Sequence, residues 1–570
     1  MLNANKTRLS ATIFTALLGM TACGGGSSSS DPTPPTNSAP TDISLSAASV
    51  DENALGAEVG SLSATDADAG DSFTYTVDDA RFEIDGATLK LTAESKLNFE
   101  QEASITVNVT VSDSASATFS KDMTIDVNDL LDYYDFPSAI MPGESAVSYS
   151  GQIARQLLIN DLNQLISSDL GDTSAFDTSG TFTNREQVMN ALTSYFDVKD
   201  YDVLSQRALL TQTTPGGQST LAEISGSSKN LVGKIAGNDA TGQHKDWLTE
   251  FEGWGAKGST TPELLVRTYF DMLADNAQTQ MDGTVRQDPF GNDINLIYLT
   301  DNGLDLKQLI QKFLIMSVAF SQGADDYLDN DVDGKGLLSS HTDTSKSYTP
   351  LEHQFDEGFG YFGAARNYLD YTDEEVAAKG GRDDWQLYHD TNADEAIDFN
   401  AEYNFGQSTN AAKRDRGATV ATDLSADAMN AFLNGRKLLN DTAGTPLTDA
   451  QMDELLGYRD QVLVAWEKAI AATVVHYIND VNADLANLGT SDFSYSDLAK
   501  HWSEMKGFGL GLQFNRLSPL SDEDFAQVHT LMADAPVMTG DVAAYTANLL
   551  VARDILQAAY EFDAENAANW

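Results

Sequence analysis

The sequence is poor in cysteine and in basic residues. It has one cysteine in 570 residues, and 34 Lys and Arg against 86 Asp and Glu, which gives a formal net charge of −52. One cysteine excludes an internal disulfide framework. A field this negative repels nucleic acid and anionic lipid, and it attracts cations. We therefore expect no nucleic-acid partner.

Motifs for hydrolysis are also missing. The chain has only seven histidines, and it contains neither H-E-x-x-H nor G-x-S-x-G. These motifs would supply zinc ligands with a base, or a serine nucleophile. Enzymatic activity therefore has little support, and a binding function is favoured.

The N-terminus lacks an apolar run long enough to cross a membrane after processing. Residues 1–22 carry Lys6 and Arg8, then a short apolar stretch and small residues, as in a secretory signal. The stretch "GMTACGGG" resembles the lipobox of bacterial lipoproteins. This resemblance implies lipidation of Cys23 and anchoring to the bacterial envelope, at the periplasmic or surface face of the outer membrane. The alternative is an ordinary cleaved signal. Residues 23–40, rich in Gly, Ser and Pro, form a flexible linker.

Residues 41–129 alternate apolar and polar side chains with period two, for example in "SFTYTV" and "SITVNVTVSD". Turn signals separate these runs, which predicts a small all-β sandwich of seven strands. The phrases "SVDENA", "ATDADAG", "LNFEQ" and "DVNDL" resemble an Ig-like cadherin repeat.

The cadherin resemblance implies a calcium site at the boundary with the following domain. Its ligands would be Glu52, Glu100, Asp126, Asn128 and Asp129. The resemblance also pairs Asp66 with Asp68 as residues that face a preceding repeat, although no such repeat precedes them here. The alternative is a spacer whose acidic loops are solvated.

Residues 131–570 change to helical periodicity, as in "SGQIARQLLINDLNQLISSDL" and "DAQMDELLGYRDQVLVAWEKAIAATVVHYINDVNADL". Start signals precede two further helices, at Thr349-Pro350 and at Ser496-Asp497. This region is too long for a small core. We therefore predict a large all-α domain made of one large or two packed helical bundles.

Two acidic loops in the helical region have spacing similar to that of EF-hand calcium loops, although both depart from the full pattern. In each case the alternative is a solvated acidic turn. The candidate ligands are Asp390, Asn392, Asp394, Asp398 and Glu402 in one loop, and Asp329, Asp331 and Asp333 in the other.

Histidines and carboxylates recur at helical spacing in "HQFDEGFGYFG" and "HWSE". His353 lies three residues before Asp356 and four before Glu357, and His501 lies three before Glu504. Helical bundles hold zinc or iron with such residues projecting from facing helices. The sequence thus predicts a shared transition-metal site, and the alternative is a hydrogen-bonded core pair. His476 lies four residues before Asp480, and for this pair we favour a structural role in the core over metal binding.

The phrases "GLDLKQLIQKFL", "LEHQFDEGFGYFGAARNYL" and "HWSEMKGFGLGLQFN" resemble an uncharacterised family of bacterial surface lipoproteins, known as a domain of unknown function. More remotely, the organisation is similar to the imelysin group, which implies iron uptake or metallopeptidase activity. The glycine that opens the imelysin motif is replaced by Leu351 or Ala499. Three hypotheses follow: a lipid-anchored metal receptor, a metallopeptidase using His353, Asp356 and Glu357, and a calcium-dependent adhesion or scaffold protein.

Overall fold

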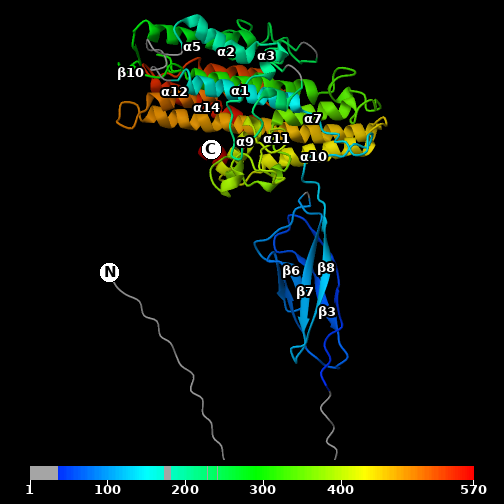
Figure 1. Ribbon diagram of the computed structural model, residues 1–570. Coiled ribbons are helices and arrows are strands. Elements are labelled where there is room, and N and C mark those ends of the chain that lie inside the picture. The colour runs from blue at the N-terminus through cyan, green and yellow to red at the C-terminus, as the bar shows by residue number, and fades with distance from the viewer. Residues whose placement is uncertain (1–35, 100, 172–181, 227–228, 240–241) are drawn as a thin grey trace, which may run out of the picture. The chain divides into compact units, whose positions relative to one another are not determined.

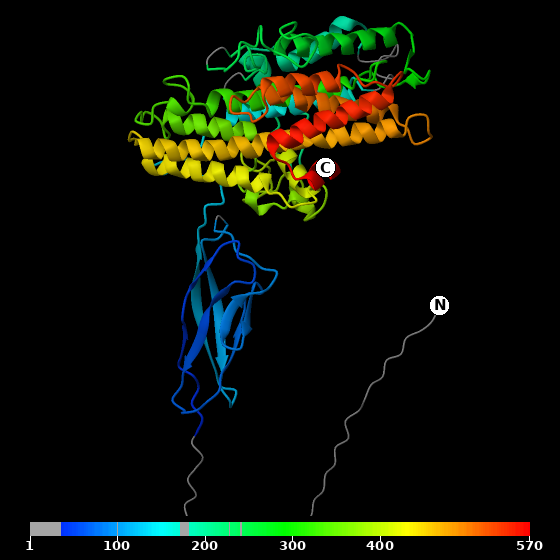
Figure 2. The same ribbon diagram turned by 180° about the vertical axis from the view of Figure 1, so that it is seen from behind.

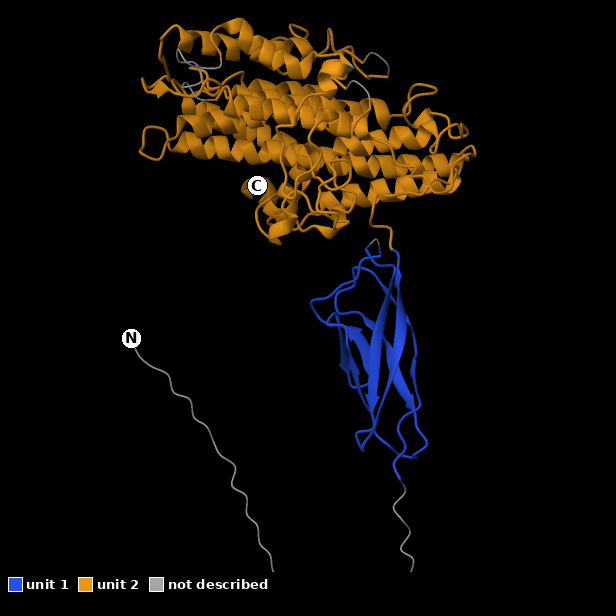
Figure 3. Cartoon of the chain, in the orientation of Figure 1, with its two compact units in different colours: residues 1–129 blue, residues 130–570 orange. Residues whose placement is uncertain are grey.

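A computed structural model of the 570-residue chain describes residues 36–99, 101–171, 182–226, 229–239 and 242–570 (Figure 1). The chain divides into two compact units, residues 1–129 and 130–570 (Figure 3). The predicted layout, a β domain followed by a helical domain, is confirmed. The predicted signal peptide, Cys23, most of the linker and Glu100 lie outside the described residues.

The first unit is a sandwich of two four-stranded sheets, ordered β1-β3-β6-β5 and β2-β8-β7-β4. The strands are β1 (Asp42–Leu45), β2 (Ser49–Asp51), β3 (Glu58–Thr65), β4 (Thr74–Val77), β5 (Phe82–Asp85), β6 (Thr88–Leu91), β7 (Ser104–Ser112) and β8 (Thr118–Asn128). Alternate residues of the longest strands are buried; Ile105, Val107, Val109 and Val111 of β7 face the core. The predicted alternation therefore does mark the inner faces.

The prediction of seven strands misses a split at the start of the domain. The first strand is divided, so that β1 pairs antiparallel with β3 and β2 pairs parallel with β8. Between them the chain crosses from one sheet to the other and passes close to Gly60 of β3. A Cβ atom at Gly60 would lie 2.9 Å from the backbone nitrogen of Ala47. Periodicity alone does not reveal such a crossing.

The second unit is helical. Its α-helices are α1 (Ser150–Ser168), α2 (Arg185–Phe196), α3 (Tyr201–Ser205), α4 (Leu221–Ile224), α5 (Pro262–Met281), α6 (Leu306–Leu314), α7 (Pro350–Phe362), α8 (Asp373–Val376), α9 (Gly406–Gly417), α10 (Leu424–Thr442), α11 (Asp449–Ala486), α12 (Tyr495–Gly509), α13 (Asp522–Met532), α14 (Val542–Tyr560) and α15 (Ala564–Asn569). Shorter elements are β9 (Arg286–Gln287), β10 (Asp293–Ile294), the π-helices η2 (Ile315–Phe320) and η3 (Gly323–Tyr327), and the 3-10 helices η4 (Gly336–Leu338), η5 (Tyr368–Asp370), η6 (Asp383–Trp385) and η7 (Leu510–Gln513).

The predicted helix starts are set by side-chain caps. Thr349 accepts the N–H of Glu352 in a capping box, with Pro350 in the first turn of α7, as predicted. The start of α12 lies slightly upstream of the prediction, because Ser494 is the residue that caps it. After α6 the helical stretch continues as the π-helices η2 and η3.

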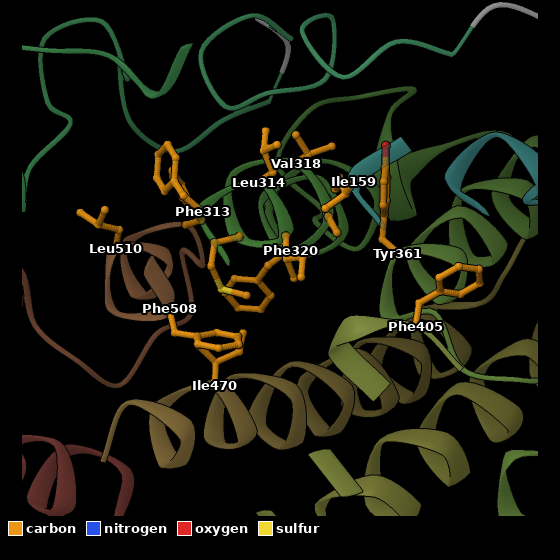
Figure 4. Packing of buried hydrophobic residues seen from close by; sticks show 14 of the residues in the cluster. Ile159, Phe313, Leu314, Val318, Phe320, Tyr361, Phe405, Ile470, Phe508 and Leu510 are labelled. Carbon is orange, nitrogen blue, oxygen red and sulfur yellow. The ribbon is translucent and has the colours of Figure 1, made fainter. Parts of the chain in front are cut away.

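One continuous hydrophobic cluster runs through the helical unit from Tyr134 to Trp570. Helix α11 lies at its centre and packs against α9, α10, α12 and α14, and Figure 2 shows α14 lying along it. Figure 4 shows Phe313 of α6, Ile470 of α11 and Phe508 of α12 contributing to the same core. Of the described helices, none is both long and apolar enough to cross a membrane.

Candidate functional site

The first predicted metal-ligand cluster, on α7, does not form as a unit, because Asp356 is held by a buried arginine. The side chain of Asp356 is fully buried. One oxygen accepts Nε of Arg436 at 2.7 Å and the hydroxyl of Tyr134 at 3.0 Å, and the other accepts the N–H of Ser148 at 3.0 Å. Burial raises the pKa of Asp356, while Arg436 opposes that shift. Both oxygens are therefore engaged within the fold.

Arg436 also binds a second carboxylate. Its Nη1 donates to Glu352 at 2.8 Å and its Nη2 donates to the carbonyl of Ala146 at 2.9 Å. Arg436 and Glu352 are both buried. This set of residues is an internal ion-pair network joining α7 to α10, and it matches the hydrogen-bonded alternative for this stretch.

His353 and Glu357 point to a different set of partners. Nδ1 of His353 donates to the carbonyl of Ser148 at 2.8 Å, and its Nε2 lies 3.9 Å from Glu357. Glu357 also accepts the amide of Gln152 at 2.7 Å. These are the contacts of a helix interface.

The second predicted pair, His501 and Glu504 on α12, does not share a partner either. Nδ1 of His501 lies 2.8 Å from Asp484 of α11, and its Nε2 lies 3.9 Å from Asp480. Burial lowers the pKa of His501, but the hydrogen bond and charge of Asp484 outweigh burial and leave that pKa raised. Glu504 instead faces Lys312 of α6, at 3.6 Å.

The predicted transition-metal site made jointly by α7 and α12 is therefore not formed. Over the described part of the chain, only one group of three or more His, Cys, Asp or Glu side chains brings its ligand atoms within 4.8 Å of one another. That group lies in the β unit and consists of Asp66, Asp71 and Asp113. A correct spacing along one helix does not determine which distant segment a side chain meets.

At the loop that begins with Asp329, a guanidinium group engages the predicted calcium ligands. Arg516 lies 3.2 Å from Asp329 and 2.7 Å from Asp331, and it donates to Asp325 at 3.0 Å. Burial is the main cause that raises the pKa of Asp329 to about 8. Arg516 pairs with Asp329 and Asp331, and among the described residues the oxygens of Asp329, Asp331 and Asp333 do not converge within 4.8 Å of one another as a group.

At the loop that begins with Asp390, the acidic side chains bind the backbone of the loop itself. Asp390 accepts the N–H groups of residues 394 and 395. The buried Glu402 accepts those of Thr391 and Asp398, each at 2.8 Å, and so closes the loop. Asn392 and Asp394 make similar short-range bonds. The loop is thus ordered by its own carboxylates.

The residues implied by the cadherin resemblance lie at both ends of the sandwich. At one end, the N–H of Glu52 donates to the carbonyl of Asn128 at 3.2 Å, while Asp126 and Asp129 are exposed. At the other end, Asp66 groups with Asp71 and Asp113 rather than with Asp68. Asp68 instead accepts the N–H of Ser38 at 2.6 Å.

The acidic group of Asp66, Asp71 and Asp113 has oxygens left for a cation. One carboxylate oxygen each of Asp66 and Asp71 is buried and has no hydrogen-bond partner in the part of the chain that the structure describes. Asp113 accepts the amide of Asn37 at 2.7 Å, which places residue 37 beside the group. Three carboxylates at this spacing repel one another by about 1 kcal/mol per pair even in water. These donors fit calcium, which prefers oxygen ligands.

A cavity of about 310 Å³ in the helical unit gathers three basic side chains, in a chain where such residues are scarce. Lys312 comes from α6, and Lys413 and Arg414 come from α9. Glu504 of α12 and Tyr477 of α11 line the same cavity, together with several neutral polar residues. We call this set the cationic pocket.

Local packing explains why these side chains meet. In α9, Asn410 accepts the hydroxyl of Thr473 at 2.8 Å and donates to the carbonyl of residue 469, which fixes α9 against α11. Arg414 and Tyr477 each follow one helical turn later and therefore lie on the same faces. Gly507 lets α12 approach α6, since a Cβ atom there would lie 2.7 Å from Cβ of Lys312.

The charges of the cationic pocket are not balanced. Lys312 pairs with Glu504, but within the described residues neither Lys413 nor Arg414 has an acidic partner within 4.0 Å. Arg414 is only 8% exposed, and among the described residues its Nε has no hydrogen-bond partner. The same holds, within that part of the chain, for one oxygen of Glu504.

The electrostatics of Lys413 reflect this excess of positive charge. Its pKa is lowered to about 8, first because the surrounding protein desolvates the ammonium group and second because Lys312 lies nearby, with Arg414 contributing. Burial likewise lowers the pKa of Arg414. A negatively charged ligand would relieve both effects.

Sequence reasoning identified Glu504 but missed the other members of this pocket. A usable signal was present: Lys413 and Arg414 are adjacent basic residues in an alanine-containing helix of a strongly acidic chain. The convergence of α6, α9, α11 and α12 was not visible in any one of these segments.

Comparison with known proteins identifies both units. A family model described as Domain of unknown function (DUF4856) matches residues 134–534. The chain belongs to the DUF4856 family. A cadherin domain model matches residues 46–128, so the DUF4856 region follows a cadherin domain and the predicted cadherin resemblance is confirmed.

Solved structures add little to the DUF4856 assignment. Human protocadherin-24 EC1-2 is 24% identical over 18% of this chain and 48% of that chain, with a TM-score of 0.15. The match thus covers about half of that protein's length, and the low TM-score lends it no weight. No curated protein matches the chain.

Proposed function

We propose that this DUF4856 protein is a binding protein for a small anionic ligand, held in the cationic pocket. The observation that carries the proposal is the convergence of Lys312, Lys413 and Arg414 on one cavity that offers them a single carboxylate, Glu504.

Physical chemistry favours an anion because positive charges gathered without partners destabilise a fold. Lys312 and Arg414 lose hydration on burial, and both lower the pKa of Lys413. Side-chain clusters of this kind persist where a ligand supplies the missing negative charge. Arg414 could offer its planar fork to a carboxylate or phosphate, and Lys413 a point charge.

The ligand class is therefore a small molecule that carries carboxylate or phosphate groups. An anionic iron chelate such as ferric citrate belongs to this class. Binding of ferric citrate therefore tests a role in iron acquisition. In that case the cargo would be recognised through its carboxylates, and no protein side chain would need to ligate the metal.

The test measures binding of phosphate, succinate, citrate and ferric citrate by isothermal titration calorimetry. We expect at least one of these to bind and Lys413→Gln to weaken that binding about 10- to 100-fold, because a charge-assisted hydrogen bond contributes about 1.5–3 kcal/mol. Lys413 is an exposed residue of α9, so the variant should fold. Lys437→Gln is the matched control, because Lys437 is an exposed residue of α10 paired with Asp441.

Two results would contradict the proposal: no measurable binding of any of the four anions, or equal affinities for Lys413→Gln and Lys437→Gln. If ferric citrate binds and citrate alone does not, then the metal itself contributes to recognition.

We further propose that the protein is a lipoprotein anchored through Cys23, with its cadherin domain between the tether and the DUF4856 region in the chain. The signal-like segment and the linker that follows it support this placement. Cys23→Ser should release the protein from membrane fractions of the expressing bacteria. Continued sedimentation of this variant with membranes would count against the anchor.

The cadherin domain is proposed to bind calcium at Asp66, Asp71 and Asp113. Support comes from the grouped carboxylates and their two unpartnered oxygens. Calorimetry should detect calcium binding that Asp71→Asn weakens. Asp122→Asn, at an exposed aspartate on β8, is the control for loss of one charge. Equal calcium binding by the two variants would refute this site.

A further inference from the structure

A second cavity in the helical unit has the opposite chemistry. It has a volume of about 260 Å³ and is lined by residues of α11, of the segment after η7, and of α14. Its apolar wall includes Leu463, Val464, Leu517 and Pro519. Val464 and Leu517 are 54% and 47% exposed, so the opening itself is apolar.

Glu467 lines this cavity and is 1% exposed. Its Oε1 accepts the hydroxyl of Tyr560 at 2.7 Å and that of Ser518 at 2.5 Å, and its Oε2 accepts the amide of Asn515. Tyr560 and Asn515 also line the cavity. The carboxyl group is thus held in one orientation by three neutral donors.

The donors that bind Glu467 in the described structure are all neutral. Among the described residues, no Lys, Arg or His lies within ion-pair distance of Glu467. Two other fully buried acids do have a cation, because Asp356 pairs with Arg436 and Asp325 pairs with Arg516. Asp161 resembles Glu467, because its printed donors are the N–H groups of Leu210 and Thr211 and the Thr211 hydroxyl.

Glu467 therefore changes its charge near neutral pH. Burial raises its pKa to about 7, although its three neutral donors and, more weakly, the charge of His244 oppose the shift. The other titratable groups that face the cavity are Asp460 and Lys468 at its wall and Tyr560. Asp460 is itself paired with Arg459 at 2.6 Å. None of these supplies the missing positive charge directly to Glu467.

We propose that this cavity binds a small ligand with a protonated amine on an apolar body, the amine lying against Glu467. The apolar wall would bury the body of the ligand, and the ammonium group would neutralise the carboxylate. Such a site is distinct from the cationic pocket, which repels amines. The net charge of −52 also raises the local concentration of cations near the protein.

The experiment compares benzylamine with benzyl alcohol, which has similar shape and no charge, by isothermal titration calorimetry on the whole protein. We expect benzylamine to bind at least tenfold more tightly at pH 8. Its affinity should rise about tenfold from pH 6 to pH 8, because Glu467 ionises over that interval. Glu467→Gln, which keeps the shape of the side chain, should abolish both the preference and the pH dependence.

Two further variants keep the proposal testable if Glu467→Gln fails to fold. Val464→Trp at the exposed rim should block the cavity without touching Glu467, and so should abolish benzylamine binding. Lys437→Gln, at an exposed lysine of α10, should leave it unchanged. The proposal is overturned if benzylamine does not bind at millimolar concentration, if benzyl alcohol binds equally well, or if Val464→Trp binds benzylamine as the unmodified protein does.

Discussion

Arg436 offers a direct test of how the helical unit is held together. Its guanidinium group is fully buried and bonds to Asp356, Glu352 and the carbonyl of Ala146. Arg436→Met keeps much of the apolar stem and removes the positive charge. The variant leaves two buried carboxylates, at 0% and 1% exposure, without their only ion-pair partner in the described structure.

The expected loss in free energy of unfolding is about 3–5 kcal/mol, the usual cost when one partner of a buried ion pair is removed. Asp356 keeps the hydroxyl of Tyr134 and the N–H of Ser148, which limits the loss. Asp356→Asn is the matched variant. It leaves one cation facing one anion, Glu352, and should cost only about 1–2 kcal/mol.

Tryptophan fluorescence during urea unfolding is a suitable assay, because all six tryptophans lie in the helical unit. The deficit of Arg436→Met should be smaller at pH 5 than at pH 8. Burial raises the pKa of Asp356, and loss of Arg436 would raise that pKa further, so acid would neutralise the stranded carboxyl group. The reasoning is refuted if Arg436→Met costs less than 1 kcal/mol, or if Asp356→Asn costs as much.

Two further predictions concern pH and packing. Burial is the main cause that lowers the pKa of His476 to about 3. Between pH 6.5 and 3 the unfolded chain therefore binds a proton that the folded protein does not, so the free energy of unfolding falls as the pH falls. In urea titrations, His476→Gln should reduce this dependence of the unfolding free energy on pH by about 1 kcal/mol per pH unit. An unchanged slope would show that His476 is not neutral in the fold. Gly435→Ala should lower the thermal unfolding temperature, at a cost of about 1–3 kcal/mol, because the new Cβ atom would lie 2.5 Å from Phe355. Gly457→Ala, in the open space around α11, should instead stabilise by about 0.5–1 kcal/mol, and a gain in both variants would contradict the packing argument.

The elements of both units could be predicted from the sequence because burial imposes a period on each. Alternation in "SITVNVTVS" identified β7, and Thr349 followed by Pro350 identified the start of α7. The split between β1 and β2 and the π-turns after α6 could not be predicted in this way. They depend on how a segment meets its neighbours, which the local pattern does not encode.

The predicted metal ligands show the same limit of prediction from local sequence patterns. His353, Asp356 and Glu357 do lie together on α7, as their spacing predicts. Asp356, however, accepts a hydrogen bond from Arg436, which lies 80 residues away in the sequence. Glu504 was identified from its spacing to His501, yet its partner is Lys312, almost 200 residues earlier. Spacing along a helix predicts which side chains share a face, whereas the identity of the facing helix is a property of the whole fold.

The strong negative charge of the chain and its cationic pocket are compatible because they act over different distances. At physiological ionic strength, exposed charges are largely screened beyond about 8 Å, whereas groups in direct contact across a cavity are screened much less. A bound anion would therefore be governed by Lys413 and Arg414, which it touches, and only weakly by the acidic surface. The same argument applies in reverse to Glu467, where the surface and the buried carboxyl group both favour a cation. One helical unit can thus contain two cavities that prefer ligands of opposite charge, because the side chains lining each cavity determine its preference.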